Sequence, residues 1–151
     1  MIRLKQILHP TDFSDASLRA AEFSVELARQ FEARLHLLHV IEDPLPTIAA
    51  LGGYVPSREE LESFARTALE TWLDAFDTES LAIERTCVHG HPFAEIVRFA
   101  RDRDVDLIVI GTHGRGFSPH LLIGSVAEKV VRKSPCPVLS VHPQDFRFVL
   151  P

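Results

Sequence analysis

The residues best suited to bind a ligand lie in a glycine-rich segment with the spacing Gly111-x2-Gly114-x9-Gly124-Ser125. Glycine has no Cβ, so the backbone N–H groups at Gly111 and Gly114 can approach an anion closely. Gly124 and Ser125 stand at the start of a predicted helix over 125–133. The unpaired N–H groups and positive dipole end of a helix N-terminus favour a phosphate. This chemistry predicts a phosphate-binding loop.

Two common glycine-rich nucleotide motifs do not fit this segment. A Walker-type loop requires a lysine after its second glycine, but Gly116 is followed by Phe117. In the dinucleotide motif G-x-G-x-x-G, the position of the third glycine is occupied by Pro119. A purely structural interpretation also stays open. Glycines after a strand are often turn residues, and Ser125-x-x-Glu128 is a capping box in which Ser125 would cap its own helix.

Further candidate residues stand at the ends of predicted strands or within the loop. Asp12 follows Pro10 and Thr11 at the end of the first strand, where it is either a turn or helix-capping aspartate or a ligand-binding group. Val40, at the end of the second strand, reads most simply as a core residue. Arg115 is the one residue of the loop that is a lysine or an arginine. Its side chain either reaches phosphates or is solvated.

Short apolar runs alternate with helical periodicities, which predicts a mainly parallel sheet covered by helices. The predicted strands are 4–10, 34–41, 82–90, 106–111 and 138–142, and the predicted helices are 16–31, 57–76, 93–103 and 125–133. The helix over 57–76 opens with a capping box, Ser57-x-x-Glu60, and carries an apolar stripe of 3.6-residue period that ends at Phe76. This order predicts a single α/β domain, a doubly wound, Rossmann-like open sheet of five parallel strands in the order 3-2-1-4-5. Such sheets bind ligands beyond the carboxyl ends of their strands, here the first and the fourth.

Composition and charge narrow the classes of function. The 151 residues suit one domain, 1–143, followed by a short tail, 144–151. The net charge of −5, with both signs interspersed, predicts neither a nucleic-acid nor a membrane partner. We find no signal-peptide pattern and no apolar run of about 20 residues. Cys87 and Cys136 lie in apolar runs and read as small buried thiols, so we expect a cytoplasmic protein.

Four further blocks accompany the glycine motif in a fixed order: "ILHPTDFS", "LLHVI", "GHPFAEIVRFA" and "SPCPVLSV". With them, the sequence resembles the universal stress protein family over about residues 2–142. The glycine segment matches the motif G-x2-G-x9-G-[ST] of the ATP-binding subclass at every fixed position. The resemblance therefore implies an ATP-binding member of that family.

The resemblance also assigns roles to individual residues. It implies that Asp12 contacts the nucleotide, that Pro10 and Thr11 shape the pocket, and that Val40 and Val126 offer backbone hydrogen bonds. The full predicted nucleotide site is Pro10, Thr11, Asp12, Val40, Gly111, Gly114, Arg115, Gly124, Ser125 and Val126.

Three functions follow from this assignment. The first is a cytoplasmic stress-response protein that binds ATP, AMP or ADP and whose nucleotide state sets its conformation or its choice of a protein partner. The second is a slow ATPase or phosphotransferase, in which Asp12 and Ser125 would hold Mg²⁺ and Arg115 would neutralise charge. The third is an interaction module without nucleotide.

The last strand, within residues 136–142, is predicted at an edge of the sheet, where an apolar unprotected strand invites pairing with another chain. The resemblance implies an antiparallel pairing of this strand across a two-fold axis, which would make a homodimer. The tail, 144–151, alternates Phe146, Phe148 and Leu150 with other residues, and we expect it to pack on the dimer interface or the sheet.

Overall fold

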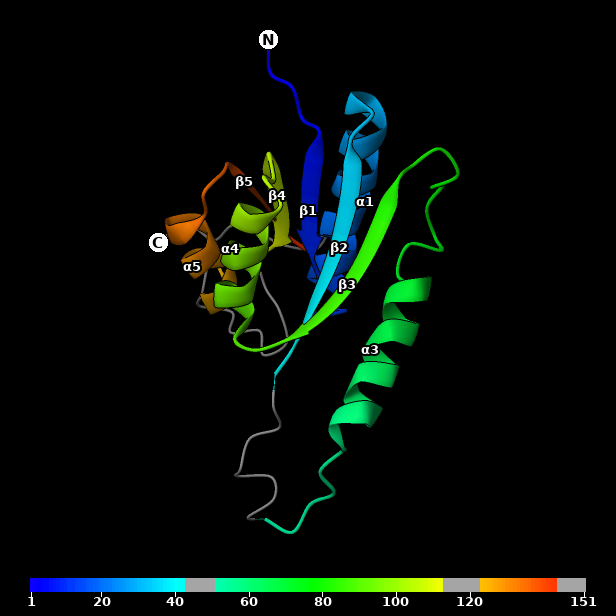
Figure 1. Cartoon of the computed structure of the whole chain (residues 1–151), viewed down its shortest axis with the longest axis vertical. Coiled ribbons are helices and arrows are strands. Elements are labelled where there is room, and N and C mark those ends of the chain that lie inside the picture. The colour runs from blue at the N-terminus through cyan, green and yellow to red at the C-terminus, as the bar shows by residue number, and fades with distance from the viewer. Residues whose placement is uncertain (43–50, 113–122, 144–151) are drawn as a thin grey trace.

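The computed structural model describes residues 1–42, 51–112 and 123–143. Within these ranges strands and helices alternate: β1 (Gln6–Pro10), α1 (Asp15–Phe31), β2 (Arg34–Ile41), α3 (Arg58–Thr71), β3 (Ile83–His89), α4 (Pro92–Asp102), β4 (Leu107–Gly111), α5 (Ser125–Lys133) and β5 (Val138–Val141). All strand pairs are parallel, and the sheet order is β3-β2-β1-β4-β5 (Figure 1). The predicted Rossmann-like fold and strand order are confirmed.

Helices cover both faces of the sheet. In Figure 1, α4 and α5 lie in front of it and α1 lies behind. One core cluster joins α1 and α3 to the sheet through Ile7 and Leu37, and the other joins α4 and α5 to it through Leu8 and Leu38. These four side chains are fully buried, although Ile7 and Leu8 point to opposite faces. Burial on both faces explains why the central strands read as uninterrupted apolar runs.

Local sequence signals set most of the helix starts. The Ser14 side chain accepts a hydrogen bond from the Ser17 N–H and caps α1. Ser57 and Glu60 form the predicted capping box of α3. Pro92 begins α4, where its missing N–H costs no helical hydrogen bond. Among the described residues, no helix has the length and apolar character that crossing a bilayer requires.

Helix α3 ends five residues earlier than the apolar stripe predicts. The N–H groups of Asp74 and Phe76 donate to carbonyls three residues back, at Thr71 and Leu73, so the chain continues in tight turns. Leu73 is nevertheless buried and Phe76 packs against the core. The stripe therefore identified core residues correctly, but it did not show where helical hydrogen bonding stops.

The two cysteines are free and only half-buried. Cys87 lies in β3, whereas Cys136 precedes β5 rather than lying in a strand. Burial raises the pKa of both thiols above its usual value. Raised values keep both sulfurs in the unreactive thiol form at neutral pH, in line with the predicted structural role.

Candidate functional site

The carboxyl ends of β1, β2 and β4 meet at one edge of the sheet. Strand β1 lies between β2 and β4, and the chain leaves β1 for α1 on one face while α4 and α5 cover the other. The strand order reverses at this point, which is where doubly wound sheets bind ligands. Three predicted site residues lie here, Pro10, Val40 and Gly111, at or next to the ends of their strands.

Thr11 fixes the chain as it leaves β1. It is buried, and its N–H donates to the Leu38 carbonyl at 2.9 Å. Its Oγ1 accepts a hydrogen bond from the Phe13 N–H at 3.0 Å. The hydroxyl therefore serves the turn between β1 and α1, and the role of Thr11 in shaping a nucleotide pocket stays a prediction.

Asp12 organises the same turn. Its Oδ1 accepts hydrogen bonds from the Ser14 N–H at 3.0 Å and from the Ser17 hydroxyl at 2.9 Å. The Asp12 N–H lies 3.4 Å from the Ser17 oxygen. Of the two interpretations of this aspartate, the turn role is thus realised in the structure. It places a carboxylate at the start of α1, at the carboxyl edge of the sheet.

Phe13 is strained and packed against aromatic rings. Its φ of 63° lies in the left-handed region, which costs a non-glycine residue about 1 kcal/mol or more. The Phe13 ring centroid is 4.5 Å from that of His39 and 5.4 Å from that of Trp72. Strain of this kind persists only where the surroundings over-determine the backbone, and here the two rings do so.

His9, directly before Pro10, completes this group of rings. Its Nδ1–H donates to the Val109 carbonyl at 3.1 Å, and its Nε2 accepts from the Trp72 Nε1–H at 3.1 Å. Burial lowers the pKa of His9 to about 4, so the ring is neutral at physiological pH. We call His9, Phe13, His39 and Trp72 the aromatic cluster. Sequence reasoning assigned none of them a role, because the hydrogen bond joins residues far apart in the chain.

Val40 combines a core side chain with a backbone that lies beyond the last residue pair of β1 and β2. Its side chain is buried against α4 and α5. The Leu38 carbonyl points towards β1, because it accepts a hydrogen bond from the Thr11 N–H. Residues two apart along a strand direct their backbone groups to the same side, so the backbone groups of Val40 also point to the β1 side. The last register pair of these strands is Pro10 with Leu38, so β1 has ended before it reaches Val40. The Val40 N–H and C=O therefore point past the end of β1.

Gly111 also has a packing role that the sequence does not reveal. A Cβ at this position would lie 2.8 Å from the backbone carbonyl carbon and oxygen of Ala16 and 2.9 Å from the Ser17 nitrogen. Its missing side chain thus makes room for the first turn of α1. Gly111 pairs with Val141 as the last residue of β4. The predicted strand 106–111 thus ends at Gly111 as expected, and the approach of the Gly111 N–H to an anion stays a prediction.

Thr112 and Gly124 close the base of the glycine segment. The Gly124 N–H donates to the Thr112 carbonyl, so both ends of the segment return to one point. Thr112 is buried, its N–H donates to the Val141 carbonyl at 2.9 Å, and its hydroxyl hydrogen-bonds with His142 Nδ1 at 3.0 Å. Gly114 and Arg115 lie outside the described residues.

The start of α5 differs from the predicted capping box. Gly124 is the N-cap and Ser125 the first helical residue, and no N-cap side chain bonds to the first turn. The Ser125 hydroxyl therefore does not cap its own helix, because it lies one residue too far along the chain. The first intrahelical bond runs from the Glu128 N–H to the Gly124 carbonyl. The N–H groups of Ser125 and Val126 precede it, at the positive end of the helix.

No metal-ligand group stands out in residues 1–42, 51–112 and 123–143: no three His, Cys, Asp or Glu side chains come together there. A Mg²⁺ ion held by Asp12 and Ser125 stays a prediction.

The model of the universal stress protein family matches residues 3–142, nearly the whole chain. The chain belongs to the universal stress protein family. Universal stress protein MJ0531 of Methanocaldococcus jannaschii is 36% identical to it over 138 residues, which are 91% of this chain and 81% of that protein.

Solved structures of universal stress proteins share the fold. UspA from Lactobacillus plantarum matches with a TM-score of 0.77 and 27% identity, over 93% of this chain and 99% of that one. A universal stress protein crystallised in complex with cAMP matches with a TM-score of 0.65 and 28% identity, over 95% of this chain and 100% of that one.

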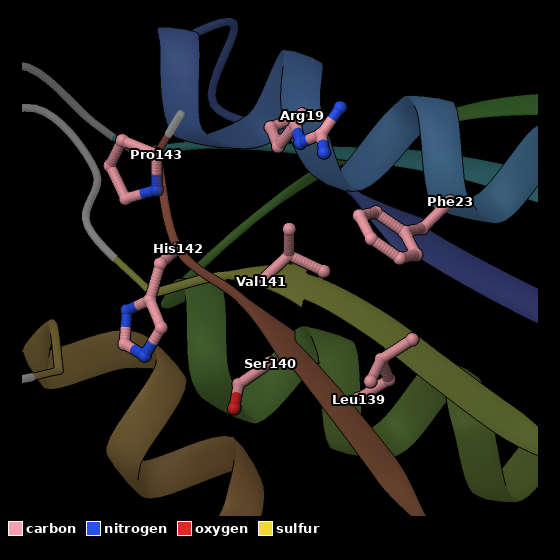
Figure 2. Close-up of a pocket in the computed structure, with 7 residues that line it drawn as sticks. All are labelled: Arg19, Phe23, Leu139, Ser140, Val141, His142 and Pro143. Carbon is pink, nitrogen blue, oxygen red and sulfur yellow. The ribbon is translucent and has the colours of Figure 1, made fainter. Parts of the chain in front are cut away.

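Among the described residues, a pocket of about 280 Å³ lies between α1 and the edge strand β5 of this universal stress protein. Arg19 and Phe23 of α1 and residues 139–143 line it. Figure 2 shows Phe23, Leu139 and Val141 on one side of the strand, with Ser140 pointing away. β5 is an edge strand, as predicted. The tail, 144–151, lies outside the described residues.

Proposed function

We propose that this universal stress protein binds an adenine nucleotide, ATP or its products AMP and ADP, at the carboxyl ends of β1 and β4. The nucleotide state sets the conformation of the protein or its choice of a protein partner in the stress response. One observation carries the proposal: the Asp12 turn, the Val40 backbone and the uncapped first turn of α5 all belong to this edge. The matching glycine motif and the relative bound to cAMP support it.

Each part of the nucleotide has a group of matching chemistry. The Val40 N–H and C=O suit the edge of adenine, and the Asp12 carboxylate suits the ribose hydroxyls. The first turn of α5, with Ser125 and Val126, suits the phosphates. A negative charge at a helix N-terminus contributes only about 0.3–2 kcal/mol, whereas micromolar binding needs about 8 kcal/mol. All three contacts are therefore required together.

Mg²⁺ would enter with the phosphates rather than alone. This ion usually binds through one or two protein oxygens together with the phosphates of a nucleotide. We assign that role to the Asp12 carboxylate and the Ser125 hydroxyl, both hard oxygen donors of the preferred kind. The proposal also takes the protein to be cytoplasmic, which agrees with the free thiols of Cys87 and Cys136.

Isothermal titration calorimetry with ATP, with and without Mg²⁺, tests the proposed function. Asp12→Asn keeps the Oδ1 acceptor of the turn but removes the charge, so we expect ATP affinity to fall about tenfold through the weaker ribose contact. Asp12→Ala also loses the turn and should bind more weakly still. Asp102→Asn, on the exposed C-terminal end of α4, is the matched control and should bind as the unmodified protein does. An unmodified protein that binds neither ATP nor AMP contradicts the proposal.

We also propose that the protein is a homodimer formed through β5, residues 136–142, together with the tail. In the described part of the chain, β5 lies at the edge of the sheet, beside a pocket to which Phe23, Leu139 and Val141 contribute, and this supports the arrangement. Phe23 is 39% exposed in the monomer, so Phe23→Asp should leave the core intact while placing a charge in the interface. We expect sedimentation at micromolar concentration to give a dimer for the unmodified protein and a monomer for Phe23→Asp. A monomer in both cases refutes the dimer.

A further inference from the structure

We propose that Trp72 and His9 are positioning residues that hold the Asp12 turn in its ligand-binding geometry, and that Trp72 senses nucleotide binding. The proposal rests on the proposed function for its ligand, an adenine nucleotide. Its structural half concerns the aromatic cluster and can be tested without any ligand. Neither residue is expected to touch the nucleotide.

The turn itself requires an external support. Asp12 precedes Phe13, whose backbone is in the left-handed region, and Ser14 follows as the cap of α1. Left alone, a phenylalanine in this conformation would relax and carry the Asp12 carboxylate with it. The Phe13 ring is held instead between the rings of His39 and Trp72. The orientation of a carboxylate on the β1–α1 turn thus depends on a ring from the segment that follows α3.

A chain of hydrogen bonds fixes Trp72 in place. The Trp72 Nε1–H donates to His9 Nε2, and His9 Nδ1–H donates to the Val109 carbonyl. His9 is fully buried and its bond to Val109 is shielded from water, whereas its bond from Trp72 is partly buried. The chain joins β4, β1 and the end of α3 directly beneath the proposed ligand edge.

The aromatic cluster also includes a residue of β2, His39. His39 Nδ1–H donates to the Thr11 carbonyl at 2.8 Å, while its ring contacts Phe13. Residues on both sides of Asp12 are therefore tied to the same group of rings. Trp72 is the only tryptophan of the chain, so its fluorescence reports on this cluster alone.

Four variants separate positioning from general stability. Trp72→Phe and His9→Leu each break the hydrogen-bond chain. His9→Gln keeps one donor and one acceptor and is the conservative rescue. Phe64→Ala, at an exposed position of α3, is the matched control because it removes an aromatic ring outside the cluster. Amide hydrogen exchange by NMR is measured in the ligand-free proteins, at Ser14 and Ser17 relative to Val25 in the middle of α1.

We expect exchange at Ser14 and Ser17, relative to Val25, to rise about fivefold or more in Trp72→Phe and His9→Leu, because both variants lose the hydrogen bond between Trp72 and His9. His9→Gln and Phe64→Ala should stay near the unmodified protein. ATP affinity by calorimetry should follow the same order, and ATP should change the Trp72 emission of the unmodified protein.

The two proposals fail in different ways. Unchanged exchange at Ser14 and Ser17 in both Trp72→Phe and His9→Leu overturns the positioning role, whether or not ATP binds. Altered exchange in a protein that binds no nucleotide keeps the positioning role and refutes the proposed function instead. Tight ATP binding with no change in Trp72 emission overturns the sensing role.

Discussion

Lowering the pH from 6.5 to about 4 is expected to remove about 3 kcal/mol of the free energy of unfolding through His9 alone. In the unfolded chain this histidine takes up a proton near pH 6.5, whereas burial lowers its pKa in the folded protein to about 4. Between these values the unfolded state binds more protons than the folded state. Stability therefore rises with pH across this window, and it is lost as the pH falls through it.

Urea unfolding at pH 7 and pH 4.5 measures this effect. Other groups titrate in the same range, so the decisive quantity is the difference between the unmodified protein and His9→Gln. The glutamine side chain does not titrate but keeps a donor for Val109 and an acceptor for Trp72. The loss of stability on acidification should be about 2–3 kcal/mol smaller in His9→Gln. Equal losses in the two proteins would show that His9 is protonated equally in both states.

The second large effect is expected from Gly111→Ala, which should lower the free energy of unfolding by about 1–3 kcal/mol. The added methyl group would lie 2.8 Å from backbone atoms of Ala16, so no side-chain rotation can relieve the contact. Either α1 or β4 must shift, and both belong to the core. The cost is one of overpacking, and it arises although the backbone of Gly111 is that of an ordinary strand residue.

Denaturant unfolding of Gly111→Ala tests this interpretation. Ser140→Ala, at an exposed position of the neighbouring strand, is the control and should change stability by less than about 0.5 kcal/mol. A Gly111→Ala protein as stable as the unmodified one would mean that the α1 backbone yields easily. In that case the packing of α1 would not explain why this position has no Cβ, and the predicted ligand role of Gly111 would be the better explanation.

Local and periodic features of this chain could be predicted from sequence. β2 and α5 have their predicted bounds, and the capping box at Ser57 and Glu60 forms as expected. The alternation of strands and helices also predicted the strand order, because right-handed crossovers leave few topologies for such a pattern. Each of these features depends on residues close together in the sequence or on a rule of chain connection.

Features that depend on distant contacts could not be predicted. The packing role of Gly111 becomes visible only when the first turn of α1 is placed against it. The bond between His9 and Trp72 spans 63 residues and leaves no mark in either local pattern. Ser125 fits a capping-box spacing, but the hydrogen bond from the Glu128 N–H to the Gly124 carbonyl shows that the N-cap lies one residue earlier.

Thr112 belongs at once to the base of the glycine segment and to the end of the edge strand. Its carbonyl accepts from Gly124, while its N–H and hydroxyl bond to Val141 and His142 at the pocket beside β5. Ligand binding and self-association would thus act on one residue, and any coupling between them must be reciprocal. If a nucleotide strengthens dimer formation about tenfold per site, the dimer binds that nucleotide about tenfold more tightly than the monomer. Affinity for nucleotide would then depend on how much of the protein the cell contains.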